Sequence, residues 1–159
     1  MKIRPLTAEN SDKVSALLSQ AFPNSRYEDR LVHNLRKNCR KTYEWVCIHK
    51  NMFIAYIAFS TAYNGDTPCG FHLAPVAVNP QYQNQGVGSE LIRFALRQKE
   101  LRDTTIYVLG DPAYYQRFGF APVDQPVCPF ARKKDHFMAK GEKVTEEFTI
   151  GYEPEFLNS

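Results

Sequence analysis

The sequence predicts a mixed α+β fold, in which helices flank a central, mostly antiparallel and twisted sheet that contains one parallel, splayed pair of strands. Residues 43–49 and 52–61 are rich in aromatic and β-branched side chains and are separated by Lys50-Asn51, which favours an antiparallel hairpin. Residues 71–78 and 104–109 enclose a helical stretch. Such a strand-helix-strand unit joins parallel strands by a right-handed crossover.

The chain begins with a predicted short strand, Lys2 to Pro5, followed by a helix. Thr7 or Asn10 can cap this helix, because short polar side chains accept hydrogen bonds from the first free N–H groups. The helix should run to about Phe22, since Pro23 cannot continue it. Its apolar face consists of Val14, Leu17, Leu18 and Ala21.

A second helix should follow Ser25, which forms a capping-box pattern with Glu28. Tyr27, Leu31 and Leu35 make an apolar stripe at four-residue spacing on this helix. The capping role explains Glu28 as a structural residue. The predicted hairpin comes next, so that two helices precede the main part of the sheet.

The strand at residues 71–78 contains Pro75, which is unusual inside a sheet. Proline has no N–H to donate to the ladder and is normally confined to an edge or a bulge. We therefore expect a bulge and a local opening of the sheet at this position.

A glycine-rich turn follows that strand, with the sequence Gln83-Asn84-Gln85-Gly86-Val87-Gly88. It opens a helix that extends to Lys99, with Val87, Leu91, Ile92, Ala95 and Leu96 directed inward. The first N–H groups of a helix lack intrahelical partners and carry partial positive charge, so that such a turn can hold a pyrophosphate. A dinucleotide fingerprint would need glycine at Leu91, and a Walker loop would need a lysine before Ser89, so both are disfavoured.

A second motif spans Val108 to Phe120 and explains itself locally as a short helix. Asp111 suits the N-cap, Pro112 the first helical position and Gly119 the left-handed residue that ends the helix. Tyr114 shares a face with Phe118, four residues on, whereas Tyr115 points roughly 100° away. One tyrosine can therefore pack while its neighbour faces a cleft.

The two motifs together resemble the GNAT superfamily of acyl-CoA-dependent N-acyltransferases. The resemblance lies in Q-x-x-G-x-G at Gln83 to Gly88 and in Y-x-x-x-G-F at Tyr115 to Phe120, and the predicted order of elements agrees from about residue 1 to 123. It implies a GNAT-like fold with a V-shaped slot at the bulge, and acetyl-CoA as co-substrate. The implied cofactor-binding residues are Val76, Ala77, Val78, Gln83, Asn84, Gln85, Gly86, Val87, Gly88 and Ser89.

The resemblance also implies how the cofactor is held and how the reaction proceeds. The main chain of Val76 and Val78 would pair with the pantetheine arm, and an amide near Val76 would polarise the thioester carbonyl. Tyr115 would be the general acid for the departing thiolate. Two departures are clear: Asp111 stands where many members have a cofactor-contacting asparagine, and Gln83 replaces a frequent basic residue.

An alkylamine acceptor must lose a proton before it can attack a thioester, since only about one part in two thousand is neutral at pH 7. His72 lies just before the bulge, where some GNAT enzymes have a glutamate, and histidine titrates near neutrality. We take His72 as the candidate base, although a lone histidine in a strand is often structural. Glu28 is a weaker candidate because its capping pattern already accounts for it.

Composition limits the other possibilities. The formal net charge of +3 suits an anionic cofactor but is too small for a nucleic-acid binder. Four cysteines show neither C-x-x-C pairing nor flanking histidines at metal-ligand spacing, so we predict no metal site and free thiols, which are typical of a reducing compartment. The longest apolar run, Met52 to Phe59, is too short to span a bilayer, and no signal region is visible. We expect a cytoplasmic protein with no membrane partner.

No repeat or linker divides the chain, so residues 1–159 should form one domain. Residues 135–139 and 145–150 are expected as final strands, separated by a proline-rich loop. The predicted function is transfer of an acetyl group from acetyl-CoA to a primary amine on a small molecule or peptide, and a homodimer would be common for such proteins. An acyl-CoA-binding sensor or interaction protein with the same fold and little turnover is the alternative.

Overall fold

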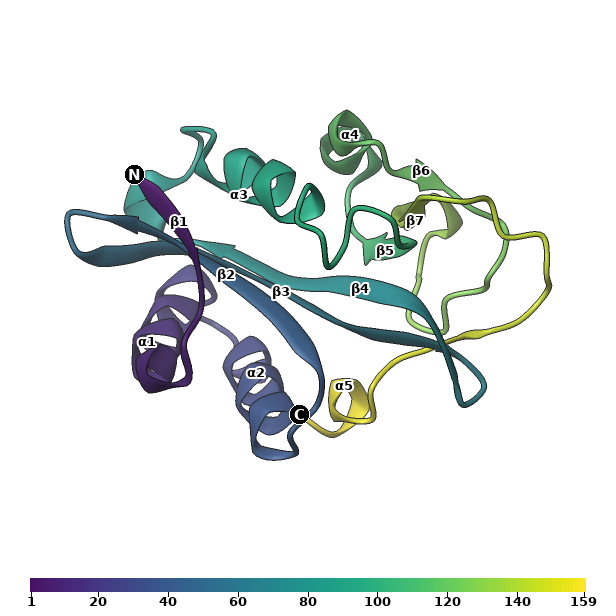
Figure 1. Ribbon diagram of the computed structural model, residues 1–159, viewed down its shortest axis with the longest axis horizontal. Helices are drawn as coiled ribbons and strands as arrows, with labels where there is room; N and C mark the ends of the chain where they lie inside the picture. The colour runs from purple at the N-terminus through teal and green to yellow at the C-terminus, as the bar shows by residue number, and fades with distance from the viewer.

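The computed structural model describes residues 1–159 as one twisted sheet with helices on both faces (Figure 1). Helices α1 (Ser11–Ala21), α2 (Tyr27–Lys37) and α5 (Glu155–Asn158) cover one face. Helices α3 (Val87–Leu96) and α4 (Pro112–Tyr115) cover the other.

The sheet has eight strands in the order β1-β2-β3-β4-β5-β7-β6, with β8 pairing to β3. Every pairing between named strands is antiparallel except that of β4 with β5, which confirms the predicted fold class. The strands are β1 (Lys2–Pro5), β2 (Thr42–His49), β3 (Met52–Asn64), β4 (Thr67–Val78), β5 (Ile106–Leu109), β6 (Ala121–Pro122), β7 (Phe137–Lys140) and β8 (Ile150–Gly151).

The predicted hairpin is formed by β2 and β3. Its turn residues Lys50 and Asn51 have φ values of 51° and 62°, which are the left-handed values that a tight two-residue hairpin turn requires. Strand β3 is buried along most of its length because both faces of the sheet are covered by helices. One core cluster lies between the sheet and α3, and a second lies between the sheet and α1 and α2.

The caps predicted for the first two helices are wrong. Helix α1 follows a short 3-10 turn, and neither Thr7 nor Asn10 caps it, since the Asn10 side chain donates to Thr7 Oγ1 instead (3.0 Å). Ser25 Oγ accepts the N–H of Tyr27 (3.2 Å), and the Ser25 N–H donates to the Phe22 carbonyl (3.1 Å). Glu28 therefore takes no part in a capping box and is free for another role.

The predicted opening of the sheet lies at Pro75. Across the β3–β4 pair, Phe59 faces Leu73 and Ile57 faces Val76, so that two residues of β4 oppose a single residue of β3. This bulge turns β4 away from β5, which pairs with it only at Phe71 and His72. The remainder of the two parallel strands diverges, as the sequence predicted.

Both motif helices form, with small changes in length. Helix α3 ends at Leu96 rather than Lys99, and the five side chains predicted to point inward are all buried. Asp111 Oδ1 accepts the N–H of Ala113 (3.0 Å), which confirms the N-cap before α4. A 3-10 turn continues α4 to Phe118, and Gly119 ends it with φ of 95°.

The C-terminal part differs from the expectation. Of the two predicted strands, residues 137–140 form β7 between β5 and β6, whereas the second shrinks to the two residues of β8, beside Tyr63 and Asn64 of β3. The chain then crosses to the opposite face of the sheet and ends in α5, which the sequence analysis did not predict. Segments from the two ends of the chain thus lie side by side, with α5 next to α2.

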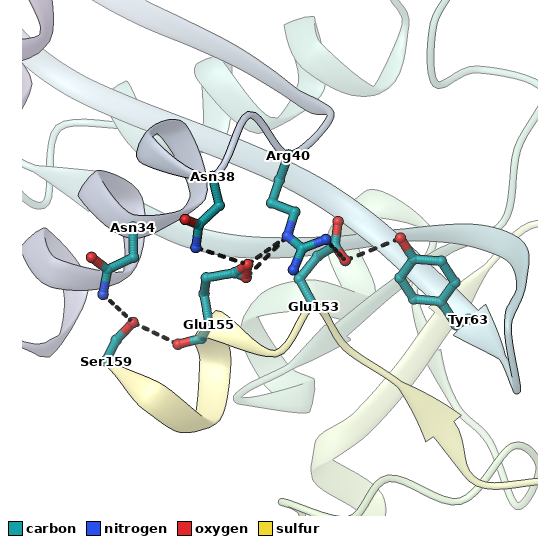
Figure 2. A network of polar contacts seen from close by, with 7 residues as sticks. All are labelled: Asn34, Asn38, Arg40, Tyr63, Glu153, Glu155 and Ser159. Atoms are coloured by element: carbon teal, nitrogen blue, oxygen red, sulfur yellow. Dashed lines mark hydrogen bonds and ion pairs between the residues drawn. The ribbon is translucent and has the colours of Figure 1, made fainter.

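Arg40 joins this C-terminal segment to the rest of the molecule (Figure 2). Its Nε donates to both carboxylate oxygens of Glu155, and its Nη1 lies 4.0 Å from Glu153 Oε1. Glu153 Oε1 also accepts a hydrogen bond from the Tyr63 hydroxyl (3.0 Å between the oxygens). Both glutamates are only 4% exposed. One cation is therefore shared by two buried carboxylates at the base of α5.

Arg40→Ala should release the C-terminal segment, because it leaves both carboxylates buried without a cation. We expect a loss of about 1–3 kcal/mol in the free energy of unfolding at pH 7, below the range for a fully buried pair because Arg40 is partly exposed. Urea denaturation measures this loss. Adding Glu153→Gln and Glu155→Gln to Arg40→Ala should recover part of it, and an unchanged urea midpoint for Arg40→Ala would refute the role of Arg40.

The same ion pair has a defined pH dependence. Burial alone would raise the pKa of Glu155, but the hydrogen bond and the charge of Arg40, together with hydrogen bonds from the main chain and from Asn38, hold the pKa below its ordinary value of 4.5. This stabilisation is therefore complete above pH 4.5 and is lost as the pH falls further, so that the wild-type and Arg40→Ala stabilities should converge in acid.

Candidate functional site

A cavity of about 310 Å³ lies where β4 and β5 diverge. Residues 72–76 of β4 and 107–109 of β5 form two of its sides. The remaining lining comes from α1 and α2, from α4, and from the C-terminal part of the chain. These contributions are Phe22, Tyr27, Glu28, Leu31, Tyr115, Phe130, Tyr152 and Phe156. The cavity is thus mostly apolar with a few polar groups, the composition typical of a small-molecule site.

A second hollow, of about 510 Å³, lies over the glycine-rich turn. Gly86 has φ of 82°, a left-handed value that glycine adopts without strain, and α3 begins directly after it. The first hydrogen bond into α3 runs from the Glu90 N–H to the Gly86 carbonyl (3.0 Å). The N–H groups of Val87, Gly88 and Ser89 therefore have no partner within the helix and are available to an anion.

Most of the predicted cofactor-binding residues border these two spaces. Val76 lines the cavity, while Val78, Gln83, Asn84, Gly86, Val87, Gly88 and Ser89 line the hollow. Two do not border either space with their side chains: Ala77 is buried against α1 and its neighbours, and the Gln85 amide donates to the Gln81 carbonyl (3.1 Å). Gln83 donates to the Val78 carbonyl (3.1 Å), so that this main-chain group already has a partner.

Arg117 is a residue of the hollow that the sequence analysis did not identify. It follows α4 and lies over the ring of Tyr114, with 5.1 Å between the guanidinium carbon and the ring centroid. Arg117 therefore borders the same hollow as the free N–H groups at the start of α3. It supplies a positive charge there, which the uncharged Gln83 does not. In the sequence, Arg117 could have been found from its position three residues after Tyr114 and two residues before Gly119.

The adjacent tyrosines of α4 serve different spaces, as the helical spacing predicted. Tyr114 lines the hollow, with its hydroxyl 3.4 Å from Ser89 Oγ. Tyr115 lines the cavity, and its ring is nearly perpendicular to that of Tyr114 (86°). Burial raises the pKa of Tyr115 to about 12, so that its hydroxyl keeps its proton at neutral pH.

His72 is deeply buried in the wall of the cavity. Its ring stacks on Tyr152 with 3.6 Å between centroids, and its Nε2 lies 3.0 Å from the Gly151 carbonyl. Because a carbonyl can only accept, Nε2 carries the proton and Nδ1 is left as the free acceptor. Burial lowers the pKa of His72 to about 4, against the opposing effect of the Gly151 carbonyl, so the ring is neutral at pH 7.

Glu28 also lines the cavity, and the sequence analysis gave it only as the weaker candidate base because a capping pattern accounted for it. Its Oε1 is buried and has no hydrogen-bond partner, and the structure records no cation beside the carboxylate. A buried carboxylate oxygen without a partner is unfavourable unless a ligand supplies one. The pattern Ser25-x-x-Glu28 concealed this role, because it is equally consistent with a cap.

The structure contains no group of three or more His, Cys, Asp or Glu residues arranged to hold a metal ion. All four cysteines are free. None of the helices is both long and apolar enough to cross a lipid bilayer.

Comparison with known proteins gives consistent results. The profile of the acetyltransferase (GNAT) domain matches residues 40–122. The uncharacterized N-acetyltransferase YhbS of Escherichia coli K12 is 34% identical over 123 residues, which cover 76% of this chain and 73% of YhbS.

Solved structures give the same picture. The crystal structure of Escherichia coli YhbS in complex with CoA superimposes with a TM-score of 0.87 and 26% identity, covering 98% of this chain and 91% of that one. A GNAT family acetyltransferase of Brucella melitensis, crystallised with acetyl-CoA, has a TM-score of 0.82 and 25% identity, with coverage of 98% and 97%.

Gly110→Ala should displace Tyr115 without removing its hydroxyl. A Cβ at position 110 would lie 2.5 Å from Cε2 and 3.1 Å from Cδ2 of the Tyr115 ring, so the ring must move. If Tyr115 acts on a bound substrate, we expect kcat to fall by roughly tenfold or more, because small misplacements of a reacting group are costly. Steady-state kinetics measures this fall.

Gly65→Ala is the control, because it also replaces a glycine but adds a Cβ with nothing within 4 Å; its φ of 62° strains the alanine, so this variant loses stability without displacing a side chain of the cavity. Its kcat should be that of the wild type. Combining Gly110→Ala with Tyr115→Phe should reduce kcat little further than Tyr115→Phe alone. Fully additive effects would show that Gly110 does not act through Tyr115.

Proposed function

Because this chain belongs to the GNAT family of acetyltransferases, we propose that it transfers an acetyl group from acetyl-CoA to a primary amine by direct attack on the thioester. The observation that supports this proposal is the arrangement around β4 and β5. Free N–H groups and Arg117 line one space, Tyr115 lines the other, and the diverging strands lie between them.

The proposed path of the cofactor follows from this arrangement. The pyrophosphate would accept hydrogen bonds from the N–H groups of Val87, Gly88 and Ser89, with Arg117 as the nearby cation. The pantetheine arm would then run along β4, past Val78 to Val76, and deliver the thioester into the cavity. The α3 turn thus fixes the anionic end and the sheet aims the reactive end.

The proposed chemistry has a complete proton balance. The amine nitrogen bonds to the thioester carbon, the carbon–sulfur bond breaks, and Tyr115 gives its proton to the departing thiolate. An ammonium acceptor brings three protons, of which the amide keeps one and Tyr115 regains one. The third proton is released to solvent. We propose that the free Nδ1 of His72 first accepts this proton and then passes it on.

The pKa values of Tyr115 and His72 determine how readily each side chain gives or accepts a proton. A phenol with a pKa of about 12 is a weak acid toward an ordinary thiol of pKa about 8.5. However, the same apolar cavity also disfavours the charged thiolate, which raises the thiol pKa and narrows the gap. His72 is neutral at pH 7 and can accept a proton, but it must pass that proton on quickly because its pKa is low.

A cytoplasmic location and a homodimer remain proposals. Four free cysteines, of which Cys39 is exposed, are compatible with a reducing compartment. Sedimentation of the purified protein would measure the oligomeric state directly.

Tyr115→Phe should separate catalysis from binding. We expect the variant to bind CoA as the wild type does, because the ring is kept, while kcat falls by about 10²-fold or more through loss of the general acid. Calorimetric titration with CoA and a thiol-release assay with a panel of amines measure the two quantities.

Three outcomes of this experiment are distinct. Thiol release that depends on an amine and on the Tyr115 hydroxyl supports transfer. Acetyl-CoA binding without thiol release for any amine would favour a sensor, and absence of any heat with CoA would refute the proposed cofactor site.

His72 should be neutral throughout the physiological range. The pKa of His72 falls from 6.5 to about 4 on folding. Between these pH values the unfolded chain binds a proton at His72 and the folded chain does not. The stability contribution is therefore intact above pH 6.5 and declines by up to roughly 3 kcal/mol as the pH falls toward 4. His72→Gln should flatten this part of the profile, and an NMR titration of His72 with a midpoint near 6.5 would contradict its burial.

A further inference from the structure

The cavity has a wall that lies outside the segment matched by the GNAT domain. The matched residues 40–122 contain β4, α3, β5 and α4, which supply the proposed cofactor path. The other wall comes from before and after this segment, and its aromatic members are Phe22, Tyr27, Phe130, Tyr152 and Phe156. This wall is therefore built from segments that precede and follow the matched region.

These aromatic side chains are held in place by contacts with one another. The Tyr27 hydroxyl donates to the Phe156 carbonyl (2.7 Å), which ties α2 to α5. Tyr152 packs against Phe130 and Phe156 with centroid distances of 4.9 and 5.0 Å, and it stacks on His72. Arg40 binds Glu153 and Glu155, the residues on either side of Pro154 between Tyr152 and Phe156, as Figure 2 shows for the two glutamates. The wall is thus a preformed apolar surface.

One carboxylate lines the cavity, and its buried oxygen has no partner. Glu153 and Glu155 are paired with Arg40, and no lysine or arginine lines the cavity. His72 is neutral at pH 7 because burial lowers its pKa to about 4. Glu28 is the one carboxylate in the lining, and its buried Oε1 has no partner. A ligand with one positive charge would complete this site.

We propose that the acceptor is a small primary monoamine with an aromatic or similarly apolar body, whose ammonium group binds Glu28 and whose body packs against the aromatic wall. This inference rests on the proposed function and names its substrate class. The ammonium supplies the partner that Glu28 Oε1 lacks, and the rings bury the apolar part of the molecule.

The same features argue against other classes of amine. A polyamine or an aminoglycoside would bring further ammonium groups into a cavity that has one carboxylate, and each unpaired charge is strongly unfavourable there. The volume of about 310 Å³ must also admit the acetyl thioester, which leaves room for a body of about one ring. Small size, a single charge and an apolar body therefore define the class.

The test compares three probes by calorimetry on the protein saturated with CoA: 2-phenylethylamine, its uncharged analogue 2-phenylethanol, and spermidine. The wild type should bind 2-phenylethylamine at least tenfold more tightly than either of the others. Glu28→Gln should remove the preference for amine over alcohol, since it deletes the charge and keeps the shape. Asp29→Asn, on the adjacent position of α2 and outside the cavity, should leave the preference unchanged.

A second variant tests the aromatic wall. Phe156→Leu should weaken binding of 2-phenylethylamine and 2-phenylethanol by a similar factor, because it removes ring contacts but no charge. Equal affinity of wild type for amine and alcohol, tighter binding of spermidine, or an unchanged amine preference in Glu28→Gln would each overturn the inference.

Thiol release on the same probes separates this inference from the proposed function. Turnover of 2-phenylethylamine with a KM that rises at least tenfold in Glu28→Gln, while the KM for acetyl-CoA stays constant, supports both. Turnover of spermidine but not of 2-phenylethylamine would overturn the substrate class and leave acetyl transfer standing. Glu28-dependent amine binding without any thiol release would support the binding site and refute transfer.

Discussion

The divergence of two parallel strands is the constraint on which the site depends. On β4 only Phe71 and His72 pair with β5, because the bulge at Ala74-Pro75 turns β4 away from β5. A continuous ladder would close the sheet and remove the cavity. The divergence also places the end of β4, and hence the glycine-rich turn, next to α4. The backbone thus creates the cavity and brings the anion-binding turn to its edge.

Burial in the cavity sets the protonation states of its polar groups. Removal from water keeps His72 neutral and Tyr115 protonated, because in each case burial disfavours the charged form. Glu28 is left without a partner in the same surroundings. Close by, Arg40 is shared by two other buried carboxylates, and none of these three side chains lines the cavity.

Local signals and tertiary contacts contributed differently to the prediction of the site. The turn at Gly86, the cap at Asp111 and the different directions of Tyr114 and Tyr115 depend on backbone geometry within a few residues, and the sequence predicted each of them. Glu28 was misinterpreted because a capping box and a cavity-lining carboxylate can share the same spacing. Only the packing of α2 against α1 and α5 decides which way the Glu28 side chain faces.

The sequence by itself determined the order of the elements from β1 to α4, the hairpin, the opening at Pro75 and the glycine-rich turn, since periodicity, turn residues and proline act over short distances along the chain. The tertiary structure alone decided that the last residues return across the sheet to form α5 and a wall of the cavity. That wall depends on Arg40 meeting Glu153 and Glu155, more than 110 residues away along the chain. Such a contact leaves no local pattern, because its free energy is gained only when both segments are already folded against the same sheet.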